Sequence, residues 1–223
     1  MKTIQRTIGL FIILFSVLVS PIQAKENSSS SWMESIAKDT KLSELSIPGT
    51  HDSATQYVSL SPIFQCQDAD IQTQLENGYC YLDIRLVLKK DNLILKHNFA
   101  KCRKNKSIFS KPLTLDDVLN DIYTFLDEHP SETIIFCVKK ENSKDDLNQV
   151  KSIFNSKINT DSWYTENRIP TLNEVRGKIG YPKKNAKKIN NHLMEYNWQK
   201  KNYGIIIIDF ANQELAHKIY STN

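Results

Sequence analysis

The sequence predicts an α/β fold built on parallel strands. Short β-branched and aromatic runs alternate with amphipathic helical patterns, as they do when each strand is followed by a helix. One run, residues 203–208, is almost pure isoleucine, which is typical of a parallel strand buried on both faces. Apolar residues make up 40% and charged residues 24% of the chain, ordinary values that predict a packed core.

Two short elements are expected before a polar loop. Residues 32–38 have the pattern of a short helix, and residues 42–47 that of a strand ending at the turn signal Pro48-Gly49. A second strand is expected over residues 79–87 and a third over residues 93–96. Polar side chains follow the first and the third of these strands.

The clearest helix of the sequence begins near Thr114. Residues 114–117 have the pattern of a capping box, and apolar residues then recur with helical spacing until Pro130. Three further elements are expected, namely a buried strand over residues 133–138, a helix over residues 145–154 and a strand over residues 178–181. Strands and helices therefore alternate through the second half as well.

A secretory signal peptide is expected over residues 1–24. Two cations precede an apolar stretch at residues 8–19, and the small-residue site Ile22-Gln23-Ala24 follows it. The stretch is shorter than the roughly 20 residues that cross a bilayer, although an uncleaved anchor is the alternative. We therefore expect a secreted protein with a polar leader over residues 25–31 and a single domain over residues 32–223.

Charge and cysteine content say little about a partner. The net charge of +4 includes the cations of the predicted signal peptide, so the mature chain is nearly neutral, and we expect a monomer that does not bind nucleic acid. Four cysteines, Cys66, Cys80, Cys102 and Cys137, allow three disulfide pairings. Cys66 with Cys102 is favoured, because both lie in polar, loop-like contexts. No Cys/His spacing typical of a zinc site occurs.

Chemically able side chains gather at the carboxyl ends of the predicted strands: His51, Asp52, Asp83, Arg85, His97 and Lys139. In a parallel α/β barrel these ends meet at one mouth. Two histidines with an arginine between them suit phosphodiester chemistry, because one ring can take a proton from a hydroxyl and the other can give one to the leaving oxygen. Taken singly, each residue could instead be a hydrogen-bonded loop residue or half of an ion pair. Three histidines are not expected to take part: His129, His192 and His217.

Residues 45–53, with the sequence LSIPGTHDS, resemble the opening of the X domain of phosphatidylinositol-specific phospholipases C, above all that of the secreted bacterial enzymes. The likeness continues in chain order and recurs near the C-terminal end. Its further segments are residues 82–85, 95–97, the helix from Thr114, and residues 129–135, 139–141, 176–179 and 207–212. Ordered motifs over more than 100 residues make the resemblance specific.

The resemblance implies a distorted TIM-type (β/α) barrel that cleaves phosphatidylinositol into diacylglycerol and a cyclic inositol phosphate. The inositol 2-hydroxyl would be the attacking group. By similarity, His51 is the general base, oriented by Asp209. His97, assisted by Asp52, would protonate the departing diacylglycerol oxygen.

The same resemblance assigns roles to an arginine and two lysines. Arg85, steadied by Asp83, would neutralise the phosphate oxygen on which charge builds up in the transition state. The eukaryotic relatives use carboxylates around a calcium ion where this sequence has the arginine, so we expect activity without a metal ion or another cofactor. Inositol recognition falls to Lys139 and, through a looser alignment, to Lys184.

The likeness thins in the C-terminal half. A barrel of this type usually needs about 250 residues, more than the predicted domain has. Between Tyr181 and Tyr203 we find no counterparts of a tyrosine and an aspartate that contact inositol in the bacterial relatives. We therefore expect a partly open barrel, shorter than usual in its C-terminal half, with a looser headgroup pocket. A decayed enzyme or a changed substrate, such as a glycosylated inositol lipid, is the other explanation.

Two further classes of protein are alternatives. A secreted, catalytically weak or inactive binding module could recognise inositol lipids through the same mouth, but it would have no chemical need for both His51 and His97. A glycerophosphodiesterase-like barrel is disfavoured, because the Glu/Asp metal set of such enzymes is absent from the sequence.

A bilayer substrate would require the domain to bind a membrane surface peripherally. Candidate residues for a membrane-facing rim are the apolar Tyr57, Phe64, Phe99, Ile108 and Phe109, with Lys101, Arg103, Lys104 and Lys106 beside them. The aromatic side chains could equally cover their loops from inside. The lysine-rich segment at residues 183–188 is either a solvated loop or a patch that attracts anionic headgroups.

Overall fold

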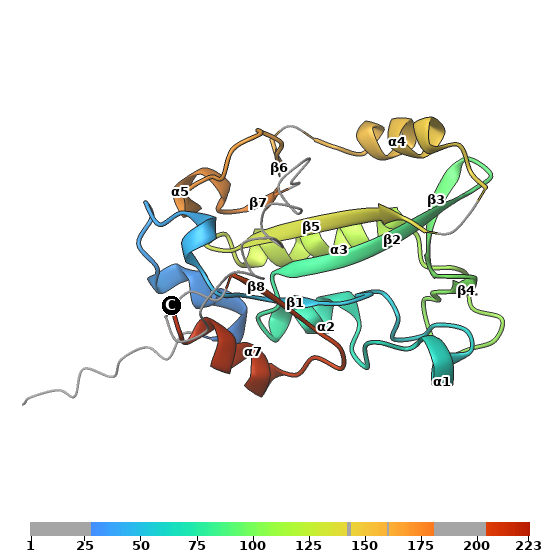
Figure 1. The fold of residues 1–223 in the computed structure, drawn as a ribbon, viewed down its shortest axis with the longest axis horizontal. Helices are drawn as coiled ribbons and strands as arrows, with labels where there is room; N and C mark the ends of the chain where they lie inside the picture. The colour runs from blue at the N-terminus through green and yellow to red at the C-terminus, as the bar shows by residue number, and fades with distance from the viewer. Residues whose placement is uncertain (1–27, 142–143, 160, 181–203) are drawn as a thin grey trace, which may run out of the picture.

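The structure, a computed structural model, describes residues 28–141, 144–159, 161–180 and 204–223. Within these ranges six parallel strands form the centre of the fold, in the order β8-β1-β2-β5-β7-β6 (Figure 1). They are β1 (Ile47–Thr50), β2 (Tyr81–Lys89), β5 (Thr133–Lys140), β6 (Trp163–Tyr164), β7 (Lys178–Gly180) and β8 (Ile205–Ile208). In the described residues β6 and β8 do not pair with each other, so the sheet is open. The predicted α/β class and partly open barrel are confirmed.

Helices cover the outer face of the sheet, and Figure 1 shows α3 running along it behind β5 and β2. The helices are η1 (Ser29–Ser35), η2 (Leu42–Glu44), α1 (Ser61–Phe64), α2 (Ile71–Glu76), α3 (Leu115–Glu128), α4 (Leu147–Ser156), α5 (Leu172–Val175) and α7 (Gln213–Tyr220). Along β2, the alternate residues Leu82, Ile84 and Leu86 are fully buried in the core. The intervening polar residues Asp83 and Arg85 therefore point to the opposite, inner face.

The helix predicted from the capping box is confirmed. The Thr114 hydroxyl accepts a hydrogen bond from the Asp117 backbone N–H (3.2 Å), and the Asp117 carboxylate accepts one from the Thr114 N–H (2.9 Å). The helix ends at Glu128, ahead of Pro130. Its apolar stripe, which includes the fully buried Ile122, packs into the main core cluster.

The predicted strand at residues 42–47 is wrong. Residues 42–44 form a 3₁₀ turn, and the strand begins at Ile47 and includes Pro48-Gly49, which had the signature of a turn. Pro48 still contributes a backbone acceptor, since its carbonyl binds the Cys80 N–H at 3.0 Å. A side chain at Gly49 would lie 2.9 Å from the Cβ of Tyr81, so glycine allows β1 and β2 to approach. The helix expected over residues 32–38 is the 3₁₀ segment η1.

The third predicted strand is not parallel to the others. β3 (Asn92–His97) pairs antiparallel with the far half of β2, with Leu86 opposite Leu95, and β4 (Ala100–Lys101) pairs with β3. Figure 1 shows β3 and the end of β2 extending beyond the rest of the sheet. The chain then folds back, so His97 reaches the site by returning along a hairpin.

Two other expectations fail at the sheet edge and in the loops. β8 pairs in parallel with β1 as predicted, but it is half-exposed rather than buried, and Ile207 is 45% exposed. All four cysteines are free thiols, so the favoured Cys66–Cys102 disulfide is absent from the structure.

Within the described residues, no helix has both the length and the apolar character needed to cross a membrane.

Candidate active site

The loop after β1 is fixed by a buried serine. Thr50 donates from its hydroxyl to the Ser53 hydroxyl (2.7 Å), which in turn accepts the Asp83 backbone N–H (2.9 Å). The Ser53 N–H donates to the Asp83 carbonyl at 3.1 Å. Between these anchors Asp52 adopts a left-handed conformation with φ of 43°, which aspartate tolerates better than most residues. These contacts place His51 and Asp52 beside β2.

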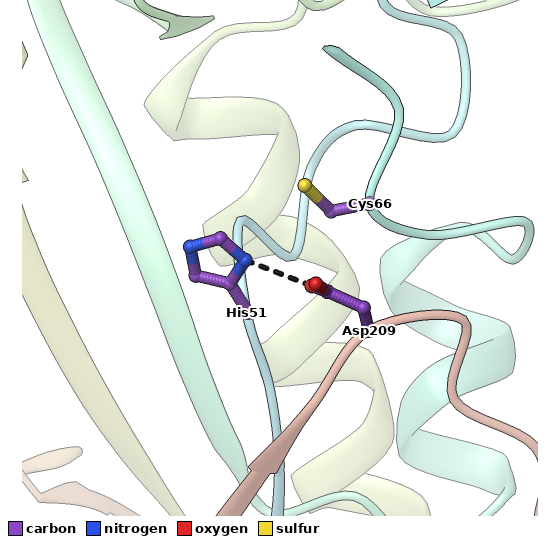
Figure 2. A group of neighbouring side chains, drawn as sticks. All are labelled: His51, Cys66 and Asp209. Atoms are coloured by element: carbon purple, nitrogen blue, oxygen red, sulfur yellow. Dashed lines mark hydrogen bonds and ion pairs between the residues drawn. The ribbon is translucent and has the colours of Figure 1, made fainter. Parts of the chain in front are cut away.

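His51 is held in the tautomer that a general base requires. Its Nδ1 lies 2.8 Å from the Asp209 carboxylate (Figure 2), and its Nε2 lies 2.9 Å from the Arg85 Nη2. A guanidinium can only donate, so Nε2 must accept, and the ring proton then sits on Nδ1 and is donated to Asp209. The basic lone pair is therefore on Nε2. The Asp52 Oδ2, 3.2 Å away, can receive a proton that this nitrogen acquires.

His97 has the opposite arrangement. Its Nδ1 lies 2.8 Å from the Phe64 carbonyl oxygen, which can only accept, and its Nε2 lies 3.3 Å from the Asp52 Oδ2. Acceptors on both sides suit a ring that carries protons on both nitrogens. The Asp52 side chain is 1% exposed, and burial raises its pKa, although Arg85 and His97 oppose that shift. Asp52 and His97 thus face each other in a part of the site that water reaches little.

Arg85 contacts three carboxylates of the site. Its Nε lies 2.5 Å from Asp52, its Nη2 lies 3.2 Å from Asp83 and its Nη1 lies 3.6 Å from Glu141. Burial lowers the pKa of the guanidinium, but Asp83 and Asp52 more than compensate, and its pKa is raised overall. The group is permanently cationic and 15% exposed, which leaves an edge for an anion to approach.

The two predicted inositol-binding lysines have different outcomes. Lys139 is exposed and pairs in register with Arg85 on the neighbouring strand β5, so both side chains lie on the inner face of the sheet. Lys184 lies outside the described residues, as do His192 and the lysine-rich segment at residues 183–188.

Two of the histidines set aside by sequence are placed elsewhere. His129 contacts Ser31 (3.0 Å) and Glu76 (3.5 Å) at the end of α3. His217 packs edge-on against Tyr220 within α7. Neither contacts the residues around Arg85.

Gln67 is a site residue that the sequence analysis missed. Its buried amide donates to the carbonyls of His51 (2.9 Å) and Ile208 (2.8 Å) and accepts the Ala211 N–H (3.1 Å). One side chain thereby ties the loop after β1 to the loop after β8, next to the His51–Asp209 pair. A glutamine in a polar segment gives no local signal of this role.

Glu141 and Cys66 were also missed. Glu141 is buried beside Arg85 and accepts the Asn98 backbone N–H at 3.0 Å, which fixes the turn after His97. The Cys66 sulfur lies 3.9 Å from the His97 Nδ1. Burial, with Asp209 and Asp52 nearby, raises the pKa of this thiol to about 11.

The apolar residues predicted for a membrane-facing rim differ in their exposure. Phe99, Ile108 and Phe109 are exposed, whereas Phe64 is buried and packs edge-on against both His97 and Phe99. Tyr57 is half-buried. Two residues not predicted, Leu60 and Ile63 of the α1 segment, are exposed next to this group in the chain.

The arrangement is suited to acid–base chemistry on an anionic ester. A ring that can accept a proton and a ring that can donate one face the same buried carboxylate, with ring centroids 6.4 Å apart, beside a fixed guanidinium. Some of these side chains could also hold a metal ion, because their ligand atoms lie within 4.8 Å of one another. Those groups are His51/Cys66/Asp209, Asp52/Cys66/His97 and His51/Asp52/Asp83.

Comparisons with known proteins agree with this geometry. Residues 40–184 match the family model described as phosphatidylinositol-specific phospholipase C, X domain. A 1-phosphatidylinositol phosphodiesterase of Listeria monocytogenes is 37% identical over 162 residues, which are 66% of this chain and 46% of that protein. A Staphylococcus aureus protein of the same name is 30% identical over 196 residues, 80% of this chain and 57% of that protein. The chain thus spans about half the length of these curated relatives.

A solved structure gives the same picture of the fold. The phosphatidylinositol-specific phospholipase C from Listeria monocytogenes superposes with a TM-score of 0.65 at 24% identity, covering 88% of this chain and 99% of that one. A Staphylococcus aureus enzyme of the same description superposes with a TM-score of 0.58 at 25% identity, covering 69% of this chain and 52% of that one.

Proposed function

Because this chain belongs to the phosphatidylinositol-specific phospholipase C X domain family, we propose that it is a secreted phosphodiesterase that cleaves phosphatidylinositol to diacylglycerol and a cyclic inositol phosphate. The observation that carries the proposal is the pair of opposed histidines around Asp52. The His51 Nε2 and the His97 Nε2 lie 3.2 Å and 3.3 Å from the same carboxylate oxygen. A protein that only bound the lipid would have no use for a base and an acid in these positions.

In the proposed reaction the lipid supplies the nucleophile. The His51 Nε2 takes the proton of the inositol 2-hydroxyl, whose oxygen attacks phosphorus, and Asp209 stabilises the imidazolium that forms. His97 gives its proton to the diacylglycerol oxygen as the phosphorus–oxygen bond breaks. The reaction leaves His51 protonated and His97 neutral, so a proton must pass back between the rings or through water before the next turnover.

Arg85 would supply the positive charge that the reaction needs. Its Nη2 lies 2.9 Å from the His51 Nε2, so the guanidinium can bind a non-bridging phosphate oxygen beside the base as charge develops there. Asp83 and Asp52 fix the orientation of the guanidinium. We therefore propose activity without a metal ion, with Lys139, and Lys184 by similarity, contacting the headgroup of this or a related inositol lipid.

We further propose that the apolar side chains near the mouth contact the membrane surface. Phe109, which is 89% exposed, is the cleanest probe, because Phe99 also packs on the Phe64 ring that contacts His97. Phe109→Ser should weaken binding to phosphatidylinositol vesicles a few-fold and leave cleavage of a soluble inositol phosphate ester unchanged. Equal loss on both substrates would contradict the membrane-facing role.

The direct test is release of soluble inositol phosphate from phosphatidylinositol vesicles in the presence of a chelator. The purified chain should be active, and His51→Ala and His97→Ala should each abolish release. His217→Ala is the matched control, because this histidine lies on α7 away from the site, and it should retain full activity. No release by the unaltered protein, with or without calcium, would favour the catalytically inactive binding module.

A further inference from the structure

Three loops bring a nitrogen, a sulfur and an oxygen ligand together at the base side of the site. His51 follows β1, Cys66 lies between α1 and α2, and Asp209 follows β8 (Figure 2). The ligand atoms of the three side chains all lie within 4.8 Å of one another. The thiol also belongs to a second group, with Asp52 and His97, so it lies between the two halves of the site.

This ligand set matches the preferences of zinc. Imidazole, thiolate and carboxylate bind Zn²⁺ at about 2.0–2.3 Å in tetrahedral geometry, which places ligand atoms about 3.3–3.6 Å apart. The His51–Asp209 contact of 2.8 Å would have to open slightly, and the thiol would have to approach. The Asp209 side chain is 52% exposed and can make that adjustment. Calcium and magnesium prefer sites made only of oxygen ligands, so a thiol and an imidazole disfavour them.

The surrounding charges also favour a cation. Three carboxylates, from Asp52, Asp83 and Glu141, contact the guanidinium of Arg85, and a fourth, from Asp209, contacts His51. The same negative environment makes the Cys66 thiolate unfavourable, since Asp209 and Asp52 add to the effect of burial on its pKa. A divalent ion would neutralise that field and displace the thiol proton.

We infer that His51, Cys66 and Asp209 form a Zn²⁺ site, with water as the fourth ligand, and that zinc inhibits the enzyme. The inhibition, unlike the binding, rests on the proposed function. Zinc would take the Nδ1 lone pair of His51, and the thiol proton would leave to solvent. The ring proton would then reside on Nε2, so the Arg85 Nη2 donor, 2.9 Å from that nitrogen, would have to turn away. A ring with its proton on Nε2 has no lone pair for the 2-hydroxyl, so His51 could not act as a base.

Cobalt provides a test of binding that does not depend on activity. Co²⁺ added to the purified chain should give the near-ultraviolet thiolate charge-transfer band and the visible bands of a tetrahedral site, and Zn²⁺ should abolish both. Cys66→Ser and Cys66→Ala should lose the charge-transfer band. Cys137→Ser is the matched control, because Cys137 is a free thiol outside the group, and it should retain the band. A missing band in the unaltered protein at saturating cobalt, or one that persists in both Cys66 variants, would overturn the site.

Inhibition is tested separately on phosphatidylinositol vesicles. Zinc should reduce the rate of the unaltered protein and of Cys137→Ser equally. With each rate expressed relative to that of the same protein without zinc, Cys66→Ser should need at least about tenfold more zinc for half-inhibition, because one of three protein ligands is lost. Equal zinc sensitivity of Cys66→Ser and the unaltered protein would overturn the inhibitory role. If the chain cleaves no phosphatidylinositol at all, the cobalt spectra still decide whether the site exists.

Discussion

The proposed acid half of the site, His97 and Asp52, and the proposed base half, His51 and Asp209, are built differently. His97 and Asp52 have side chains that are 19% and 1% exposed, and they lie between the returning hairpin and the core. His51 and Asp209 are 37% and 52% exposed, and Asp209 follows an edge strand of the described sheet. The His51–Asp209 contact is the shorter of the two, 2.8 Å against 3.3 Å for His97–Asp52, yet water reaches it much more readily.

This difference teaches that the shorter contact need not have the larger energetic weight. Removing one member of a buried charged pair leaves an uncompensated group in a medium of low polarity, which costs several kcal/mol. An exposed pair is screened by water and salt, and its coupling is about 1 kcal/mol or less. We therefore expect substitutions in the acid half to be far more damaging than equivalent substitutions in the base half.

The largest effect is expected for Asp52→Asn. This change removes the carboxylate that faces His97 and also leaves Arg85 without its closest partner. The rate of phosphatidylinositol cleavage should fall about 10³-fold, mainly in kcat, because proton donation and phosphate binding are both disturbed. Asp116→Asn, which alters an exposed carboxylate of α3, is the control and should have no effect. A loss of less than tenfold for Asp52→Asn would contradict the assigned importance of the buried half.

Asp209→Asn should cost less, about tenfold in kcat. The amide oxygen can still accept the His51 Nδ1–H and preserve the tautomer, so only the charge that stabilises the imidazolium is lost. Because that charge is exposed, the ratio between the unaltered protein and the variant should shrink at high salt. Measurement of kcat across ionic strengths checks this expectation. A loss as large as that of Asp52→Asn would show that the two halves do not differ.

Gln67→Met tests whether the function of His51 and Asp209 depends on the hydrogen bonds of Gln67. The variant keeps the side-chain volume but deprives the His51 and Ile208 carbonyls and the Ala211 N–H of their partner. It should lower kcat a few-fold with little change in KM, and reduce the free energy of unfolding by about 2 kcal/mol. Thr133→Val, which removes a hydrogen bond from a buried hydroxyl to the Lys178 carbonyl (2.8 Å) at the start of β5, is the control for stability loss alone. Equal loss of kcat in both variants would reduce Gln67 to a structural role.

The smallest effect on activity is expected for a substitution of Glu132, the residue before β5. Burial raises the pKa of this carboxyl to about 8, and one of its oxygens, Oε2, has no hydrogen-bond partner. The folded state thus binds this proton more tightly than the unfolded state does. Its contribution to stability is complete below the ordinary pKa near 4.5 and is lost as pH rises to about 8.

Glu132→Gln should remove that dependence. Urea unfolding at pH 5 and pH 8 should show the unaltered protein losing a few kcal/mol between the two values, and the variant losing much less. The rate of lipid cleavage at each pH should be unaltered by the substitution. A stability difference that persists in Glu132→Gln would assign the pH dependence to other groups.

The sequence by itself determined several local elements and supplied the candidate reacting groups. The capping box fixed the start of α3, because a cap needs only residues three positions apart. The order of motifs pointed to His51, Arg85, His97 and Asp209 before any distance was known. Even the wrong strand at residues 42–47 led to the correct loop, since Ile47 does begin β1.

Only the tertiary structure decided how those groups meet. His51 and Asp209 are 158 residues apart in the chain, and the glutamine that braces them carries no local pattern. His97 arrives along an antiparallel hairpin, which periodicity cannot distinguish from a parallel strand. No cysteine or histidine follows Cys66 at a spacing typical of a zinc site. In the folded chain, however, the ligand atoms of His51 and Asp209 lie within 4.8 Å of its sulfur. Hydrogen bonds and burial between distant segments set these contacts, and they depend on the whole fold rather than on neighbouring residues.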